Sequence, residues 1–196
     1  MPLYAPDGRD STKIHPDFPY FHHYFSGKRH ILSPGDLFMK VKHWKTYLFW
    51  ILLAEGVGGL SGYLTRDGVA RYEAMVQKPP LTPPAWVFPV VWGILFALMG
   101  IGAARVYQVP ASDARSRGLK LFLVQLLVNF LWSIFFFNGR LYLFSFLWIL
   151  GLWGLILLMI TAFRPLDRWA AVMQIPYLLW VTFAAYLTFG VWRLNG

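Results

Sequence analysis

Five apolar stretches, each about 20 residues long, constrain this chain more than any other feature of its sequence. A helix needs about 20 mostly apolar residues to cross the hydrocarbon core of a bilayer. Helices are required there because no water is present to satisfy free backbone groups. The sequence therefore predicts an all-α integral membrane protein, a single bundle of five transmembrane helices. The expected spans are residues 44–64, 86–107, 119–137, 141–163 and 169–192.

Composition supports a membrane protein and argues against several other classes. Hydrophobic residues make up 57% of the chain and charged residues 14%, whereas soluble domains have roughly 45–50% and about 25%. The absence of cysteine excludes disulfides, thiolate metal sites and cysteine nucleophiles. The formal charge of +9 does not indicate nucleic-acid binding, because the basic residues flank apolar runs.

Residues 1–43 differ from the rest of the chain, which we treat as the transmembrane domain 44–196. This extension is polar, contains all five histidines and has no apolar run long enough for a signal peptide. We predict a partly disordered cytosolic tail with a short interfacial helix near 35–42. The histidines show no metal-site spacing, and no metal is predicted. Aromatic residues suited to the membrane surface are Phe18, Tyr20, Phe21, Tyr24 and Phe25.

The distribution of lysine and arginine predicts the orientation. From Lys28 onward, eleven of these residues lie in the N-terminal segment and in the loops expected on the same side, against five on the opposite side. The positive-inside rule then places the N-terminus in the cytoplasm.

A proline-rich segment precedes the second expected span. Prolines 79, 80, 83 and 84 lie between Lys78 and Trp86, and they fix φ and remove backbone donors. One interpretation is a rigid loop that only begins a helix. The other is a stiff lid over the mouth of the bundle.

Polar residues recur every four positions in the third span, at Gln125, Asn129 and Ser133, with Trp132 beside them. This spacing places them on one helical face. A side-chain amide within a membrane must find a partner, so this face either joins helices or lines a ligand cavity, and the two are compatible.

The last and the first expected spans contain further residues that could shape the bundle or serve a function. Pro176 is expected to bend the last span, near Gln174 and Tyr177. Trp180 either packs in the core or forms a flat wall for a planar aromatic ligand. In the first span, Glu55 is either a neutral residue bonded to a neighbouring helix or a functional ionisable group.

Three separated motifs, in order, resemble the translocator protein / tryptophan-rich sensory protein (TspO/MBR) family over roughly residues 46–195. The first is Lys78-Pro79 with Pro83-Pro84-Ala-Trp86-Val-Phe, Trp92 and Met99-Gly100. The second is Gln125-Leu-Leu-Val-Asn129-Phe-Leu-Trp132-Ser. The third is Pro176-Tyr177-Leu-Leu-Trp180-Val-Thr-Phe-Ala184.

The resemblance implies a five-helix bundle that often dimerises, with a cavity for tetrapyrroles such as protoporphyrin IX. No cofactor is required, and the porphyrin is a ligand. The cavity would be lined by Trp92, Phe96, Gln125, Asn129, Trp132, Trp180 and Ala184. A lid loop would comprise Tyr72, Lys78, Pro79, Pro83 and Pro84. The family usually has a Trp-Tyr pair before Lys-Pro, for which only Tyr72 is available here.

Three functions remain open from the sequence. The leading hypothesis is a receptor-like or transporter-like protein with a sensory or regulatory role that binds porphyrins or similar hydrophobic ligands. The second is a light-dependent, porphyrin-degrading enzyme in which Trp92 or Trp180 donates an electron or energy. The third is a proton-coupled transporter that uses Glu55. We expect a bacterial inner membrane, with an outer membrane as the alternative.

Overall fold

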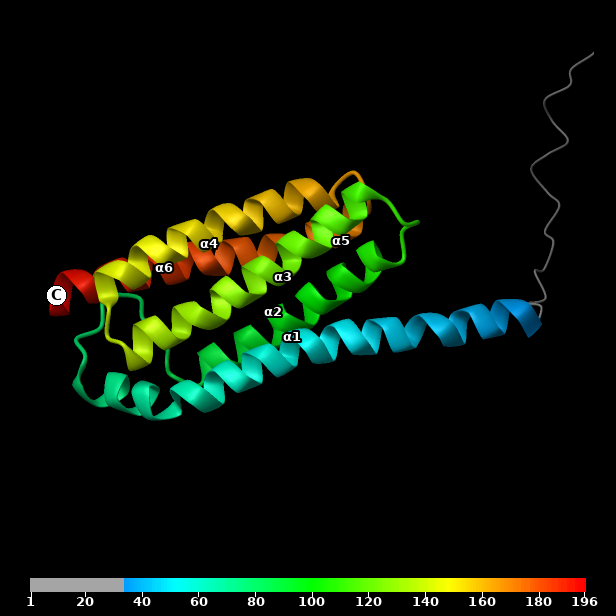
Figure 1. The fold of residues 1–196 in the computed structure, drawn as a ribbon. Helices are drawn as coiled ribbons and strands as arrows, with labels where there is room; N and C mark the ends of the chain where they lie inside the picture. Colours follow the sequence, from blue (N-terminus) through cyan, green and yellow to red (C-terminus); the bar gives the residue numbers. More distant parts are fainter. Residues whose placement is uncertain (1–33) are drawn as a thin grey trace, which may run out of the picture.

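A computed structural model describes residues 34–196 of the chain, with side chains from residue 43 onward. The predictions for residues 1–33, including the aromatic residues suited to the membrane surface, lie outside these residues. The described part is a bundle of helices whose axes run roughly side by side (Figure 1). The elements are α1 (Pro34–Met75), α2 (Val87–Tyr107), α3 (Asp113–Ser133), the π-helix η1 (Ile134–Asn138), α4 (Tyr142–Phe163), α5 (Arg168–Val172) and α6 (Ile175–Asn195).

Five helical segments are long and apolar enough to cross a membrane, which confirms the predicted fold class. They have mean hydropathies between 1.3 and 2.5 and are 21 to 33 residues long, and no strand occurs in residues 34–196. The segments are His43–Met75, Val87–Tyr107, Asp113–Asn138, Tyr142–Phe163 and Arg168–Asn195.

Helix α1 is longer than the apolar run that predicted it. The stretch 35–42, expected as a separate short helix, is continuous with α1, and the helix extends to Met75. Polar residues after position 64 include Arg71 and Glu73, which favour helix and are exposed here. Hydropathy marks the part of a helix that suits lipid and not the residue where the helix ends. The loop expected near 65–85 is therefore reduced to residues 76–86.

The third span ends in a wider helical turn. In η1 the N–H of Gly139 donates to the carbonyl of Ile134, five residues earlier, at 3.0 Å. Arg140 follows with φ of 53°, in the left-handed region that L-residues rarely adopt. This change of backbone lets the chain reverse and start α4 only two residues later.

The last span is interrupted and not merely bent, which corrects the prediction for Pro176. Pro176 has no N–H to donate to the carbonyl of Val172, and α5 ends at Val172. Helix α6 begins at Ile175, with Pro176 in its first turn, where a missing N–H costs little. Asp167 caps α5, since its side chain accepts from the N–H of Ala170 at 2.8 Å.

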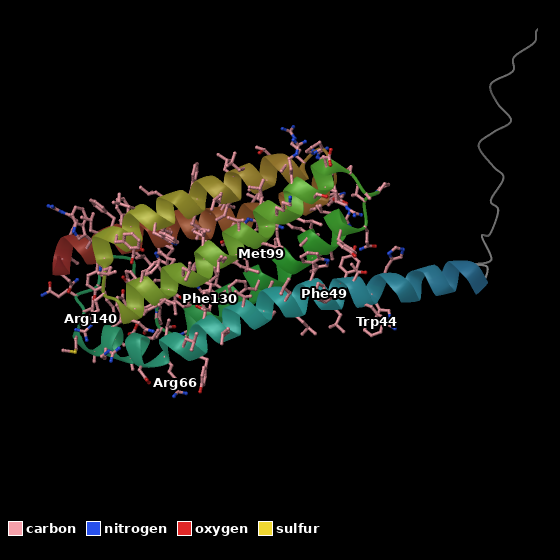
Figure 2. The ribbon with its side chains drawn as sticks, in the orientation of Figure 1. Trp44, Phe49, Arg66, Met99, Phe130 and Arg140 are labelled. Carbon is pink, nitrogen blue, oxygen red and sulfur yellow. The ribbon has the colours of Figure 1, made fainter. Side chains whose placement is uncertain are left out.

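Close packing between α1 and α2 forms one side of the bundle. A Cβ added at Gly100 would lie 2.5 Å from the Cα of Ile51, so only glycine permits this approach of the two backbones. Met99, next to it, is completely buried, whereas Trp44 and Phe49 of α1 point away from the bundle (Figure 2). The outward face of α1 thus presents apolar side chains where lipid would lie.

The bundle has two distinct ends (Figure 1). One end carries the 76–86 loop, the turn between η1 and α4, and the C-terminus of α6. The other end carries the connections α2–α3 and α4–α5. We call the first end the lid end.

Candidate functional site

Tyr177 joins two of the predicted cavity residues inside the bundle. The side-chain amide of Asn129 donates to the Tyr177 hydroxyl at 2.8 Å, and that hydroxyl donates to Gln125 Oε1 at 2.9 Å. All three side chains are buried. Because buried polar groups are costly without partners, this network both joins α3 to α6 and fixes the orientation of the amides.

Trp92 and Phe96 of α2 lie against the same network. The Trp92 ring stacks on Phe96 at 5.5 Å between centroids, and it meets the edge of Tyr177 at 6.1 Å. Phe96 in turn packs on Gly58 of α1, where a Cβ would lie 2.3 Å from its ring. Four of the seven predicted residues, on α2 and α3, therefore converge around one tyrosine of α6.

The other three predicted residues lie in neighbouring clusters. Trp132 stacks on Phe136 of η1 at 5.1 Å. Trp180 is half-buried and meets Phe88 of α2 at 5.9 Å, edge to face. Ala184 is buried on α6, one turn beyond Trp180. The aromatic surface thus extends from the Tyr177 network along α2, α3 and α6.

Three N–H donors in this region have no partner among the described residues. They are Gln125 Nε2, Trp132 Nε1 and Trp180 Nε1, and each of these atoms is shielded from solvent. Buried donors are nearly always hydrogen-bonded in proteins. These three donors therefore stand out from the other polar groups of the described interior.

The proline-rich loop is attached to α6. Asn195 accepts from the Gln77 N–H and donates to the Gln77 carbonyl, both at 2.9 Å. Pro79 is buried against Gly190, at which an added Cβ would lie 2.5 Å from the Pro79 Cβ. The Tyr186 hydroxyl donates to the Pro80 carbonyl at 3.2 Å.

The remaining predicted lid residues lie around this attachment. Lys78 forms an ion pair with Glu73, and its ammonium lies over the Tyr72 ring at 5.6 Å. Pro83 is half-buried and Pro84 is exposed, with its carbonyl accepting from the N–H of Val87. The start of the loop is therefore attached to α6, and its end forms the turn that begins α2.

A cavity of about 800 Å³ opens at the lid end, away from the Tyr177 network. Its lining includes Tyr72 but none of the seven predicted cavity residues. It lies between the end of α1, η1, the start of α4 and the end of α6. The lining residues are Gly68, Arg71, Tyr72, Met75, Val76, Phe137, Arg140, Leu141, Tyr142, Leu143, Phe144, Leu147, Trp192, Asn195 and Gly196.

Two other polar residues singled out from the sequence have different surroundings. Ser133 continues the α3 stripe, but it bonds the Ser61 hydroxyl of α1 and so joins helices. Glu55 is half-buried, and within the described residues no hydrogen bond joins it to a neighbouring helix. The interpretation of Glu55 as an interhelical bonding group thus has no support in residues 43–196.

An ion pair fastens the opposite end of the bundle. Arg105 of α2 contacts Asp167 with two nitrogens, at 2.7 and 3.1 Å. Burial by itself would raise the pKa of Asp167. The hydrogen bonds from Arg105 and the Ala170 N–H, together with the Arg105 charge, outweigh burial and lower this pKa below its ordinary value. The carboxylate is thus held ionised as the cap of α5.

The role of Tyr177 was not predicted from the sequence, although the residue stood beside Pro176 in the third motif. Gln174, Tyr177, Val181 and Ala184 are spaced for one helical face, and all four are buried. From that spacing, the sequence could have predicted that Tyr177 lies on the buried face of α6.

These features define a polytopic helical membrane protein with an aromatic and amide-lined interior beneath a proline-rich loop. The comparisons with known proteins agree. The model of the TspO/MBR family matches residues 50–193, and the chain belongs to this family.

Relatives from bacteria and a mammal match most of the chain. The tryptophan-rich protein TspO of Chlorobaculum tepidum is 36% identical over 151 residues, which cover 76% of this chain and 96% of that protein. The tryptophan-rich sensory protein of Cereibacter sphaeroides is 37% identical, with coverages of 78% and 92%. The translocator protein of Ovis aries is 32% identical, with coverages of 73% and 86%.

Proposed function

We propose that this chain binds a planar tetrapyrrole such as protoporphyrin IX among the aromatic and amide side chains of α2, α3 and α6. The proposal is of a receptor-like or transporter-like protein with a sensory role. The observation that carries it is the set of unpaired N–H donors on Gln125, Trp132 and Trp180 beside the Tyr177 network. Ligand sites combine apolar and aromatic walls with a few oriented polar groups.

The chemistry of a porphyrin fits this environment. Its ring offers a large flat face for Trp92 and Trp180, because aromatic groups attract by offset or edge contacts. Its carboxylates and ring nitrogens are acceptors for buried N–H donors. The lid loop, held on α6 by Asn195 and Gly190, would limit exchange with the aqueous phase.

Membrane placement and assembly form part of the same proposal. The excess of basic residues on the N-terminal side supports a cytoplasmic N-terminus, and we propose that the chain is a homodimer in a bacterial inner membrane. The lid end, with α6's C-terminus, then faces the opposite compartment.

A titration tests the binding site. Protoporphyrin IX should quench tryptophan fluorescence saturably in purified protein. Trp92→Leu with Trp180→Leu should weaken binding by about tenfold or more, since losing an aromatic side chain that stacks on a flat ring costs on the order of 1–3 kcal/mol. The matched control is Trp44→Leu with Trp169→Leu, which removes two indoles that are 52% and 64% exposed.

Affinity is read from porphyrin absorbance as well as from fluorescence, so that the loss of two emitters does not distort the comparison. Unchanged affinity in the Trp92/Trp180 variant, with the control also unchanged, would refute this site.

A further inference from the structure

The 800 Å³ cavity at the lid end has an apolar wall and two basic side chains. Leu143 and Leu147 of α4 line it and are 44% and 58% exposed, so the wall continues onto the outer surface of the bundle. Arg71 comes from the end of α1, and Arg140 lies between η1 and α4. A ligand here must be amphipathic, with an apolar part along α4 and a polar group near the arginines.

Charge favours an anion as the polar group. Among residues 43–196, neither Arg71 nor Arg140 forms an ion pair, a side-chain hydrogen bond or a cation–π contact. By contrast, Arg66, Arg105 and Arg115 each have such a partner. No aspartate or glutamate side chain lines the cavity.

The backbone places Arg140 in a costly conformation. Its φ of 53° is left-handed, although the neighbouring Gly139, which would adopt such a φ freely, has φ of −77°. Strained non-glycine residues and π-helices both concentrate at functional sites. Here the strain falls on Arg140, one of the residues that line the cavity, and Arg140 lies at the end of the bundle (Figure 2).

The cavity also lies at the level of a membrane interface. It is formed where the α1, α4 and α6 spans begin or end, and Tyr72, Tyr142 and Trp192 line it. Tyrosine and tryptophan favour the headgroup level of a bilayer. An amphipathic anion supplied by the bilayer itself meets all of these conditions.

We propose that this cavity is a binding site for an anionic glycerophospholipid. The headgroup phosphate lies at the guanidinium groups of Arg71 and Arg140, which suit phosphate because they donate several N–H groups in a planar fork. An acyl chain follows α4 along Leu143 and Leu147. This site is separate from the proposed tetrapyrrole site, and neither proposal depends on the other.

The experiment compares lipids on purified full-length protein in neutral detergent. Phosphatidylglycerol should raise the melting temperature and be retained in native mass spectrometry in preference to phosphatidylcholine. Arg71→Gln with Arg140→Gln should reduce that preference about tenfold, because both guanidinium groups then lose their charge-assisted hydrogen bonds to the phosphate. The control, Arg66→Gln with Arg193→Gln, removes the same charge at the same end outside the cavity and should keep the preference.

Three outcomes would overturn the proposal. One is equal retention of phosphatidylcholine and phosphatidylglycerol by the unmodified protein. Another is an equal loss of preference in the control, which would indicate general surface charge. The third is full protection by inorganic phosphate alone, which would indicate a site for a soluble anion. If the double variant does not fold, the single change Arg71→Gln, on an exposed turn of α1, is measured in its place.

Discussion

Removing the hydroxyl of Tyr177 tests the central network of the bundle most directly. Tyr177→Phe keeps the ring, and with it the contact to Trp92, but leaves Asn129 Nδ2 and Gln125 Oε1 without the partner they have in the structure. All three side chains are buried, so water cannot replace the lost hydroxyl.

Two kinds of measurement on other proteins give a range for the loss in the free energy of unfolding. Interhelical hydrogen bonds in membranes average about 0.6 kcal/mol and reach about 1.7 kcal/mol, which gives roughly 1–3 kcal/mol for two bonds. Leaving a buried polar group without a hydrogen-bond partner costs about 1–3 kcal/mol, which gives roughly 2–6 kcal/mol for two groups. The ranges overlap at about 2–3 kcal/mol, and this is the expected loss in the free energy of unfolding for Tyr177→Phe.

The measurement is equilibrium unfolding in mixed detergent micelles, followed by circular dichroism. Tyr63→Phe is the control because Tyr63 is 62% exposed and its hydroxyl has no hydrogen bond within the described residues. A double-mutant cycle with Asn129→Ala should show coupling of at least about 0.5 kcal/mol between residues 129 and 177. A loss below about 0.5 kcal/mol, equal to that of the control, would show that the network contributes little.

Two further predictions concern the ends of the bundle. Asn195→Ala removes both hydrogen bonds to the Gln77 backbone. Each of these hydrogen bonds contributes about 0.5–1.5 kcal/mol, so the variant should release porphyrin severalfold faster in stopped-flow measurements. An unchanged dissociation rate would show that the loop does not control the exit of the ligand. The lowered pKa of Asp167 means that its pairing with Arg105 contributes stability above the pKa of an unfolded aspartate, about 3.9. That contribution is lost as the pH falls through the lower pKa that Asp167 has in the folded protein. The melting temperature of Asp167→Asn, measured against pH, should lack this acid-dependent loss. If the loss persists in the variant, another group causes it.

The sequence predicts the number of helices well because each span leaves a local signal. Hydropathy over about 20 residues depends little on how the helices pack, so all five spans are recovered. The spacing of Gln125 and Asn129 likewise predicts a shared polar face, and the structure buries both residues.

Features that depend on packing between helices could not be predicted in this way. Tyr177 is the partner of the α3 amides only because of how α6 is rotated about its axis, which no single helix reveals. Pro176 signalled a disturbance, but the break after Val172 depends also on the cap that Asp167 provides for a separate α5. The lid-end cavity depends on η1 and on the left-handed Arg140, and hydropathy carries no information on either.

The close approach at Gly100 restricts how a flat molecule could enter from the side. The seam between α1 and α2 is closed there by backbone against backbone, and no side-chain rotation can widen it. The seam between α2 and α6 is different, because Trp92 meets Tyr177 and Phe88 meets Trp180 through aromatic edges. Rings can turn about χ1 and χ2 without moving a helix. A flat ligand that came from the lipid would therefore meet side chains between α2 and α6, whereas between α1 and α2 it would meet backbone at Gly100.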